Sequence, residues 1–301
     1  MNGEKIDALV KENIMKIAVS GAGGFVGRHL VSMLKARGWV VVPLHTPDFS
    51  LDETAFAAKL DGADAVVHLA GATINRRWTE DYKKELYASR VKTAEKIVNA
   101  MAAMTVKPKL FICTSAVGIY ASTGRYDEEN AVYADDFLGR LVRDWETAAL
   151  KAETAGVRTV IFRYGLVLGR DGGILQEMLP PFRFGLGGTI GDGKQAFSWV
   201  HIDDLVRAYL FTVEQDGMEG VYNLTAPVPT TNAGLTKALG KVLRRPTLFA
   251  IPKLVLRLRF GSEAAAALSS GQDVLPKRLR EAGFVFTFET VDAALADLVG
   301  A

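Results

Sequence analysis

The chain has little of several features that mark specialised classes of protein. Among 301 residues there is one cysteine, Cys113, so no internal disulfide can form, and we expect a buried structural thiol in a reducing compartment. No uncharged apolar run approaches the roughly 18 residues of a membrane span. Residues 1–14 contain acidic side chains and no apolar signal-peptide core. We therefore expect a cytoplasmic protein with no membrane partner.

An excess of charge of one sign is also missing. The chain has 36 Lys and Arg against 34 Asp and Glu, and the net charge of +2 gives no reason to expect nucleic acid or an anionic membrane as partner. The four histidines, His29, His45, His68 and His201, are scattered, and we find no cluster of metal ligands. The composition favours an enzyme that acts on a small-molecule substrate, as a monomer or homodimer, without a metal.

A glycine-rich turn between a strand and a helix stands near the start of the chain. Residues 16–28 read KIAVSGAGGFVGR, with glycines at Gly21, Gly24 and Gly27. The first glycine allows φ > 0 where the strand turns, the second lets the backbone approach a pyrophosphate, and the third allows close helix–strand packing. Since the next helix points free N–H groups at phosphate, the turn, with Phe25 and Val26, predicts dinucleotide binding rather than a plain connection.

Strands and helices alternate along most of the chain. This pattern predicts a doubly wound α/β fold, with a parallel sheet and the ligand at the carboxyl ends of its strands. We expect an extension over 1–14, an NAD(P)-binding domain over 15–228 with a substrate-side excursion near 168–200, and a small, mainly helical cap over 229–301. The expected strands are 39–44, 65–69, 110–114, 157–162 and 221–224, and the expected helices include 51–60, 79–104, 135–151 and 230–243.

Several segments carry a resemblance to a known family. The G-x-x-G-x-x-G spacing, AVVHLAG at 65–71, FICTSAVGIY at 111–120 and VYNLTAP at 221–227 resemble an extended branch of the short-chain dehydrogenase/reductase superfamily. This epimerase-like branch includes proteins called nucleoside-diphosphate-sugar epimerases or cell-division-inhibitor-like proteins. The resemblance runs from about residue 15 to the C-terminus. It implies a Rossmann-type fold and an NAD(P)-dependent oxidoreductase or epimerase, with a nucleotide-linked sugar as candidate substrate.

The resemblance also implies further cofactor contacts. It places small residues at the end of the strand 65–69 along the dinucleotide, matches two positions of the long helix that reach back toward the cofactor, and makes one residue after the strand 157–162 a backbone contact. His68 is more simply read as a packed strand residue than as a catalyst. The implied cofactor residues are Leu69, Ala70, Gly71, Glu85, Arg90 and Val167.

The choice between NAD and NADP depends on the end of the strand 39–44. A carboxylate there accepts from the 2′-hydroxyl of NAD, whereas relatives in this branch often have Ser-Arg, which suits the 2′-phosphate of NADP. This chain has His45 and Thr46, which tolerate a phosphate, while Asp48 is either a hydroxyl acceptor or part of a solvated turn. We expect NADP or NAD, with a slight preference for NADP.

The usual catalytic pair of the superfamily is missing. Its proton donor is a tyrosine with a lysine four residues later, whose ammonium lowers the pKa of the phenol. None of the eight tyrosines has a lysine at that spacing, and the helix 135–151 offers Phe137 and Leu141 instead. The chemistry therefore uses another group, or the protein is a non-catalytic NAD(P)-binding sensor or scaffold.

Two hydroxyls and two basic segments remain as candidates for the substrate side. Ser115 follows the strand 110–114 where the superfamily keeps a catalytic hydroxyl, although a shift of one residue would place Ala116 there, and Tyr120 is either a hydrogen-bond donor on the same loop or an aromatic wall. The loop around 76–77 offers two guanidinium groups to a phosphate or sugar, or is a solvated basic turn. The expected substrate-side residues are Arg76, Arg77, Lys194 and Gln195.

Overall fold

Six parallel strands form the centre of the molecule. The computed structural model describes residues 14–300, so all but the last position of the expected extension 1–14 lies outside the described residues. The order across the sheet is β10-β6-β4-β3-β1-β2, which confirms the doubly wound parallel sheet and places its topological switch point between β1 and β3. The strands are β1 Lys16–Ser20, β2 Val40–Leu44, β3 Ala65–His68, β4 Leu110–Ala116, β6 Arg158–Tyr164 and β10 Gly220–Leu224.

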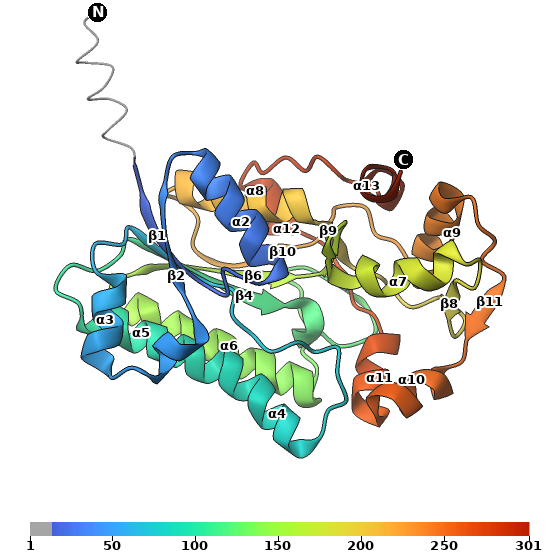
Figure 1. The fold of residues 1–301 in the computed structure, drawn as a ribbon, viewed down its shortest axis with the longest axis horizontal. Coiled ribbons are helices and arrows are strands. Elements are labelled where there is room, and N and C mark those ends of the chain that lie inside the picture. The colour runs from blue at the N-terminus through green and yellow to red at the C-terminus, as the bar shows by residue number, and fades with distance from the viewer. Residues whose placement is uncertain (1–13, 301) are drawn as a thin grey trace, which may run out of the picture.

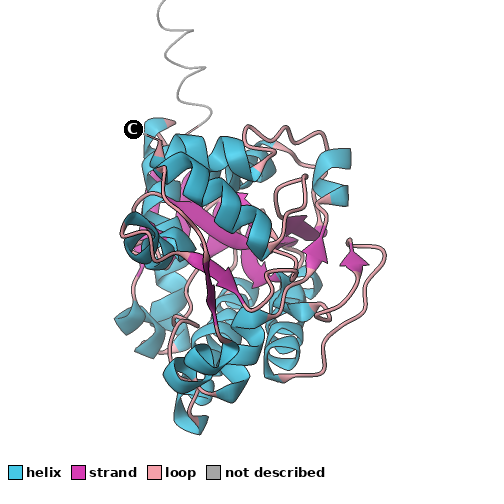
Figure 2. Cartoon of the chain, turned by 90° about the vertical axis from the view of Figure 1, so that its right-hand side faces the viewer, coloured by secondary structure: helices cyan, strands magenta, loops and turns pink. Residues whose placement is uncertain are grey.

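Helices cover both faces of this sheet (Figure 1). α2 Phe25–Ala36 and α8 Ile202–Glu214 lie above it in that view, and α3 Glu53–Leu60, α5 Thr93–Ala103 and α6 Phe137–Thr154 lie below. Figure 2 shows the same arrangement from the side, with the strands between two layers of helices. Each helix buries one apolar stripe against the strands, as Leu30 and Leu34 of α2 do.

The long helix expected over 79–104 is present but interrupted. It consists of α4 Glu80–Tyr87, a π-helical turn at Ala88–Lys92, and α5. Thr79 caps its start, since its side chain accepts a hydrogen bond from the backbone of Tyr82 at 3.2 Å. A π turn inserts one extra residue into a helix and occurs frequently at functional sites.

The segment near 168–200, expected as a substrate-side excursion, contains a helix. α7 Gly173–Arg183 includes Pro180 and Pro181, which a sequence pattern treats as helix breakers. Both lie in the last turn, where their carbonyl groups still accept hydrogen bonds from the backbone of Phe184 and Leu186 at 3.3 and 2.9 Å.

Short elements complete the substrate side and the C-terminal part. Three two-stranded parallel pairs, β5 with β12, β7 with β9 and β8 with β11, lie outside the main sheet. The remaining strands are β5 Arg125–Tyr126, β7 Leu166–Gly169, β8 Gly188–Ile190, β9 Trp199–His201, β11 Phe249–Ile251 and β12 Asp273–Val274. The remaining helices are α9 Asn232–Leu243, α10 Lys253–Phe260, α11 Ser262–Ser269, α12 Lys277–Glu281 and α13 Val291–Val299.

The hydrophobic core crosses the expected domain boundary near residue 228. One cluster of buried side chains joins Ile17 and Val19 of β1 to residues of the C-terminal part, among them Leu235, Leu239, Leu279, Phe284 and Leu295. A second cluster fills the space between the sheet and α3, α5 and α6, and includes Cys113 of β4. No helix within residues 14–300 is long and apolar enough to cross a membrane.

Candidate functional site

The three glycines of the first turn have three different surroundings. Gly21 ends β1 with a φ of +71°, and a Cβ there would come within 2.8 Å of the backbone nitrogen of Ala70. A Cβ on Gly27 would come within 2.1 Å of the Gly21 carbonyl oxygen, whereas one on Gly24 would meet that same oxygen alone, at 3.2 Å. The surroundings of each glycine therefore agree with the sequence pattern. Gly21 forms the turn, Gly27 allows close packing, and Gly24 keeps the start of α2 free of a side chain.

The start of α2 is open to an anion. Gly24 is its N-cap residue, no side chain caps the helix, and its first turn holds no acidic residue. Unpaired N–H groups and the positive end of the helix dipole therefore point out of the turn at the carboxyl end of β1. Such a helix start has the geometry of an anion-binding site.

The turn after β7 packs against this helix start. The Phe25 ring fills the space that side chains at Gly169 and Gly172 would need, since a Cβ on either would lie 2.3 Å from it. Asp171 accepts from His29 at 2.8 Å, and this interaction lowers the pKa of the Asp171 carboxyl. Val167 lies within β7 and adjoins this turn, since its carbonyl oxygen is 2.2 Å from a Cβ built on Gly173. The structure thus brings Phe25 and the Val167 segment together, as a shared cofactor wall requires.

At the end of β2 the carboxylate of Asp48 is already engaged. It accepts from the backbone nitrogen of His45 at 2.7 Å and pairs with Lys59 at 3.1 Å. The hydrogen bond from the His45 backbone lowers the pKa of Asp48, and Lys59 adds to this effect. Since Asp48 caps its own turn, it is not free to accept from a ribose 2′-hydroxyl in this conformation, while His45 is exposed, as is Thr46 beside it.

The end of β3 is held by a buried serine. Ser20 Oγ lies 2.7 Å from Nδ1 of His68 and accepts from the backbone nitrogens of Leu69 and Ala70 at 3.2 and 3.3 Å. His68 is fully buried, and burial lowers its pKa to about 4. The histidine therefore packs as a neutral strand residue and fixes the backbone along which the cofactor is expected.

The two long-helix residues expected to face the cofactor lie in different surroundings. Arg90, in the π turn, donates to the Ala72 carbonyl at 2.8 Å and lies over the Trp145 ring. Its guanidinium would be 3.1 Å from a Cβ on Gly71, and burial lowers the pKa of Arg90 to about 10. Glu85, by contrast, is exposed on α4. Arg90 thus supports the loop after β3, and Glu85 lies on the solvent side.

Ser115 and Tyr120 belong to one buried network of hydrogen bonds. Ser115 Oγ donates to Glu146 at 2.5 Å, and Arg163 donates to both oxygens of Glu146 at 2.7 Å. Arg163 also donates to the Tyr120 hydroxyl at 2.8 Å, and that hydroxyl donates to Asn223 at 2.8 Å. Ser115 is 2% exposed and Tyr120 0%, so both hydroxyls point inward to protein partners rather than toward a shared substrate oxygen.

Electrostatics explain why this network is stable. Burial opposes the charge on Arg163, but the paired hydrogen bonds to Glu146 outweigh it and raise the pKa of the guanidinium. Burial also disfavours the charged form of Tyr120 and thereby raises the pKa of its hydroxyl, so the phenol stays protonated. Sequence reasoning missed Arg163 as a partner. The available signal was a charged residue inside an otherwise apolar strand, since a buried arginine requires a carboxylate nearby.

Another phenol contacts the same arginine from the surface. Arg163 Nη2 lies 3.4 Å from the Tyr133 hydroxyl, and the guanidinium is 5.4 Å from the centre of that ring. Tyr133 is 46% exposed, in the loop that precedes α6. Tyr133 is therefore the phenol of this network that lies at the surface, with a cation beside its hydroxyl.

The start of α6 offers no substitute for the missing pair. Phe137 packs against Trp78, with the ammonium of Lys83 lying 5.4 Å from its ring centre. The neighbouring row of the helix carries Leu138, beside Gly118, and Val142. The positions four residues apart are therefore apolar in either alignment, Phe137 with Leu141 or Leu138 with Val142. A one-residue shift of alignment does not restore a tyrosine–lysine pair.

The expected substrate-side residues are not gathered at one point. Arg76 and Arg77 are exposed; Arg76 lies over the Tyr82 ring, and Arg77 lies 3.7 Å from a Cβ built on Gly261, at the junction of α10 and α11. Lys194 is exposed, whereas the Gln195 side chain donates to the Ile190 carbonyl at 3.0 Å within its own turn. The arginine loop therefore faces the C-terminal part, and Gln195 supports the backbone.

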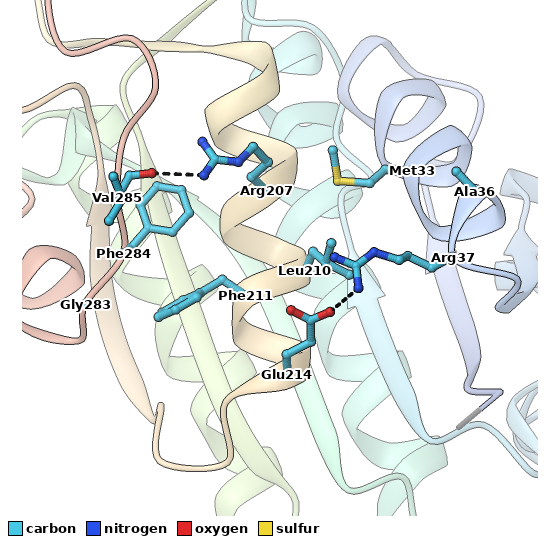
Figure 3. A pocket seen from close by; sticks show the side chains of 10 residues that line it. All are labelled: Met33, Ala36, Arg37, Arg207, Leu210, Phe211, Glu214, Gly283, Phe284 and Val285. Carbon is cyan, nitrogen blue, oxygen red and sulfur yellow. Dashed lines mark hydrogen bonds and ion pairs between the residues drawn. The ribbon is translucent and has the colours of Figure 1, made fainter. Parts of the chain in front are cut away.

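The best-defined hollow in the surface lies away from these residues. It has a volume of about 510 Å³ and opens between the C-terminal end of α2, α8 and residues 283–285 (Figure 3). Arg37 and Glu214 pair across it at 2.7 Å. Since α2 runs back from the carboxyl end of β1, this hollow lies toward the amino ends of the strands, and we do not assign the cofactor to it. Within residues 14–300, no group of three or more His, Cys, Asp or Glu could hold a metal ion.

Comparison with known proteins agrees with this geometry. The model of the NAD dependent epimerase/dehydratase family matches residues 17–225, and a domain of unknown function (DUF1731) matches residues 251–298. The human epimerase family protein SDR39U1 is 37% identical over 95% of this chain and 100% of its own length. An Arabidopsis thaliana homologue, named as chloroplastic, is 38% identical over 95% of this chain and 87% of its own length.

A solved structure gives the same result. The crystal structure of human SDR39U1, isoform 2, with NADPH is similar to this fold with a TM-score of 0.86 and 35% identity, over 94% of this chain and 99% of that one. A UDP-glucose 4-epimerase from Thermotoga maritima, 20% identical with a TM-score of 0.74, shares the fold. The match to the family model over more than half of the sequence, with relatives at this identity, shows that the chain belongs to the NAD dependent epimerase/dehydratase family.

Proposed function

We propose that the protein binds NADP(H) across the carboxyl ends of β1, β3 and β4, and acts as an oxidoreductase or epimerase on a small polar substrate. The start of α2 carries this proposal, because no side chain caps it, its first turn holds no acidic residue, and free N–H groups there can hold a phosphate. A nucleotide-linked sugar is the candidate substrate, since relatives of the same fold are epimerases of such sugars.

The turn that follows β2 favours NADP over NAD. Asp48, the first carboxylate in the sequence after that strand, is held by the His45 backbone and by Lys59. Without a free carboxylate the site loses the usual acceptor for a 2′-hydroxyl, while exposed His45, with Lys59 nearby, suits a 2′-phosphate. The NADPH bound to the human relative supports the same choice.

In the proposed reaction the nicotinamide would supply hydride transfer, and the protein would position the substrate and move a proton. We assign the proton to the Tyr133 hydroxyl rather than to Tyr120, because Tyr133 is exposed and adjoins the Arg163 guanidinium. Glu146 and Tyr120 would hold Arg163 in place through direct hydrogen bonds, and Ser115 would support Glu146. The guanidinium would then stabilise negative charge on the phenol or on a substrate oxygen.

Calorimetric titration with NADPH and NADH tests the cofactor. We expect NADPH to bind at least as tightly as NADH. NADH binding more than about tenfold tighter, a difference of roughly 1.4 kcal/mol, would show that Asp48 leaves its cap and accepts the ribose hydroxyl, and our account of this turn would be wrong.

A non-catalytic NADP(H)-binding sensor is the second candidate. It is favoured by the apolar start of α6 and by the inward orientation of Ser115 and Tyr120. A screen of metabolites, including nucleotide-linked sugars, separates the two if it follows both cofactor absorbance and the identity of the recovered metabolite. An oxidoreductase consumes cofactor with at least one class of substrate. An epimerase regenerates its cofactor but converts a sugar into its epimer, whereas a sensor shows tight cofactor binding and neither change in the entire screen.

A further inference from the structure

The charge of the chain is balanced overall but not locally. Residues 220–262 contain no Asp or Glu and seven basic residues, Lys237, Lys241, Arg244, Arg245, Lys253, Arg257 and Arg259. The net charge of the whole chain, +2, hides this segment because acidic residues elsewhere compensate for it. A region of one sign attracts partners of the other, and here the partner is anionic.

The same region exposes large apolar side chains. Those on α10 are 50–72% exposed, and the segments that adjoin β8 and β11 contribute residues that are up to 88% exposed. We call this set the α10 surface: Phe184, Leu186, Leu248, Phe249, Leu254, Val255 and Leu258. Single exposed apolar residues are common, but a group of seven on adjoining segments indicates an interaction site.

The segments that carry these basic and apolar residues also lie close together in space. β11 pairs with β8, and the Arg245 side chain donates to the Arg183 carbonyl at 3.0 Å. α10 follows β11 after Pro252, and the three elements lie together at one end of the molecule (Figure 1). The α10 surface therefore lies on neighbouring segments at one end of the molecule.

The geometry of α10 separates its faces sharply. At about 100° per residue, Leu254, Leu258 and Val255 share an arc of roughly 100°. Phe260 lies on the opposite side and is buried. Arg257 and Arg259 border the apolar arc on its two sides, each within roughly 60° of it. An apolar stripe with arginines on both borders is the pattern of a helix lying in a membrane interface, where the guanidinium groups reach the headgroups.

We propose that the α10 surface docks on a bilayer that contains anionic lipids, with the apolar side chains entering the interface and the arginines contacting lipid phosphates. A second copy of the chain suits the patch less well, because a symmetric contact would bring the two sets of arginines together. Acidic residues also border this region. Glu177 lies 3.5 Å from Arg259, Asp292 lies 3.9 Å from Lys241, and Glu263 is paired with Lys83, so none of these three cancels Arg257.

Flotation with lipid vesicles tests the proposal on the full chain. We expect binding to vesicles of equal parts phosphatidylglycerol and phosphatidylcholine, little binding to phosphatidylcholine alone, and a loss of binding in 0.5 M salt. Arg257→Gln should weaken binding about fivefold, the effect of roughly one basic residue at an anionic surface. Failure to float with the anionic vesicles, or equal binding to both kinds, would overturn the proposal.

A matched pair of variants locates the surface. Leu258→Glu together with Leu254→Glu should reduce partitioning at least tenfold, whereas Val106→Glu should not, because Val106 is similarly exposed, at 74% against 72% for Leu258, but lies before β4. Since all three side chains are on the outside, we expect unchanged melting temperatures. Patch variants that bind like the unmodified protein would overturn the assignment. So would a dimer, seen by sedimentation equilibrium, that the patch variants dissociate, since the surface would then serve a second copy.

Discussion

Gly24 is the residue on which cofactor binding depends most directly. We expect Gly24→Val to reduce affinity for NADPH at least a hundredfold while the fold persists, because the branched side chain would occupy the open position at the start of α2. Calorimetric titration measures the loss. Gly217→Val is the control, since a side chain there meets nothing within 4 Å. Unchanged affinity in the Gly24 variant would place the cofactor elsewhere.

Tyr133 and Tyr120 both contact Arg163, but loss of the hydroxyl should affect turnover at one and stability at the other. Tyr133→Phe should lower turnover about a hundredfold with little change in stability, the usual size of a positioned acid–base contribution. Tyr120→Phe removes the hydroxyl that bonds Arg163 and Asn223, so each loses one buried hydrogen bond, and we expect a loss of about 1–3 kcal/mol in the free energy of unfolding. Steady-state kinetics and urea denaturation distinguish the two. If turnover falls in the Tyr120 variant alone, the proton donor is Tyr120.

His68 should make the protein sensitive to acid. Its pKa is about 4 in the folded state against 6.5 in the unfolded chain, so the unfolded state binds a proton first as the pH falls. Stability that is present above pH 6.5 is therefore lost progressively down to about pH 4, with a slope approaching 1.4 kcal/mol per pH unit. Urea denaturation of the protein and of His68→Gln should give slopes that differ by about one proton. Parallel slopes would show that another group causes the effect.

At the scale of secondary structure, sequence patterns identified the elements and turns that depend on nearby residues. The strands β3 and β4 begin with apolar runs because helices cover both sides of the sheet, and each lies within two residues of its expected bounds, 65–69 and 110–114. The roles of Gly21, Gly24 and Gly27 were also predictable, since they depend on local backbone geometry. The orientation of Ser115 was not, because Glu146 and Arg163 come from α6 and β6 and meet only in the folded chain.

One ion pair links α4 to the C-terminal part. Lys83 bonds to Glu263 of α11 and to Glu80 at 3.0 Å, and hydrogen bonding to Glu263 raises the pKa of Lys83. We expect Lys83→Met to speed amide hydrogen exchange over residues 262–269 by up to about fivefold, since a partly exposed pair contributes about 1 kcal/mol at most. Lys84→Met, which breaks a pair within α4, is the control. Equal exchange in both variants would show that the pair does not hold α11.

At the scale of the molecule, the expected boundary at residue 228 does not divide the core. Side chains of α9, α12 and α13 belong to the same cluster as β1. We expect a fragment of residues 15–228 to lack a cooperative thermal transition, because it exposes the apolar surface that these helices cover. Near-ultraviolet circular dichroism and thermal melting check this. A sharp transition near that of the full chain would show that the first unit folds alone.

The single cysteine gives the protein an internal reporter. Cys113 lies on β4, between β3 and β6, with 1% of its surface exposed, and burial raises the pKa of its thiol well above the ordinary range. A thiol reagent can reach it only when the centre of the sheet opens. The rate of modification therefore measures how often the whole sheet opens, with no label introduced. Added NADPH should slow that rate in proportion to the occupancy of the cofactor site, so affinity can be measured before any substrate is known.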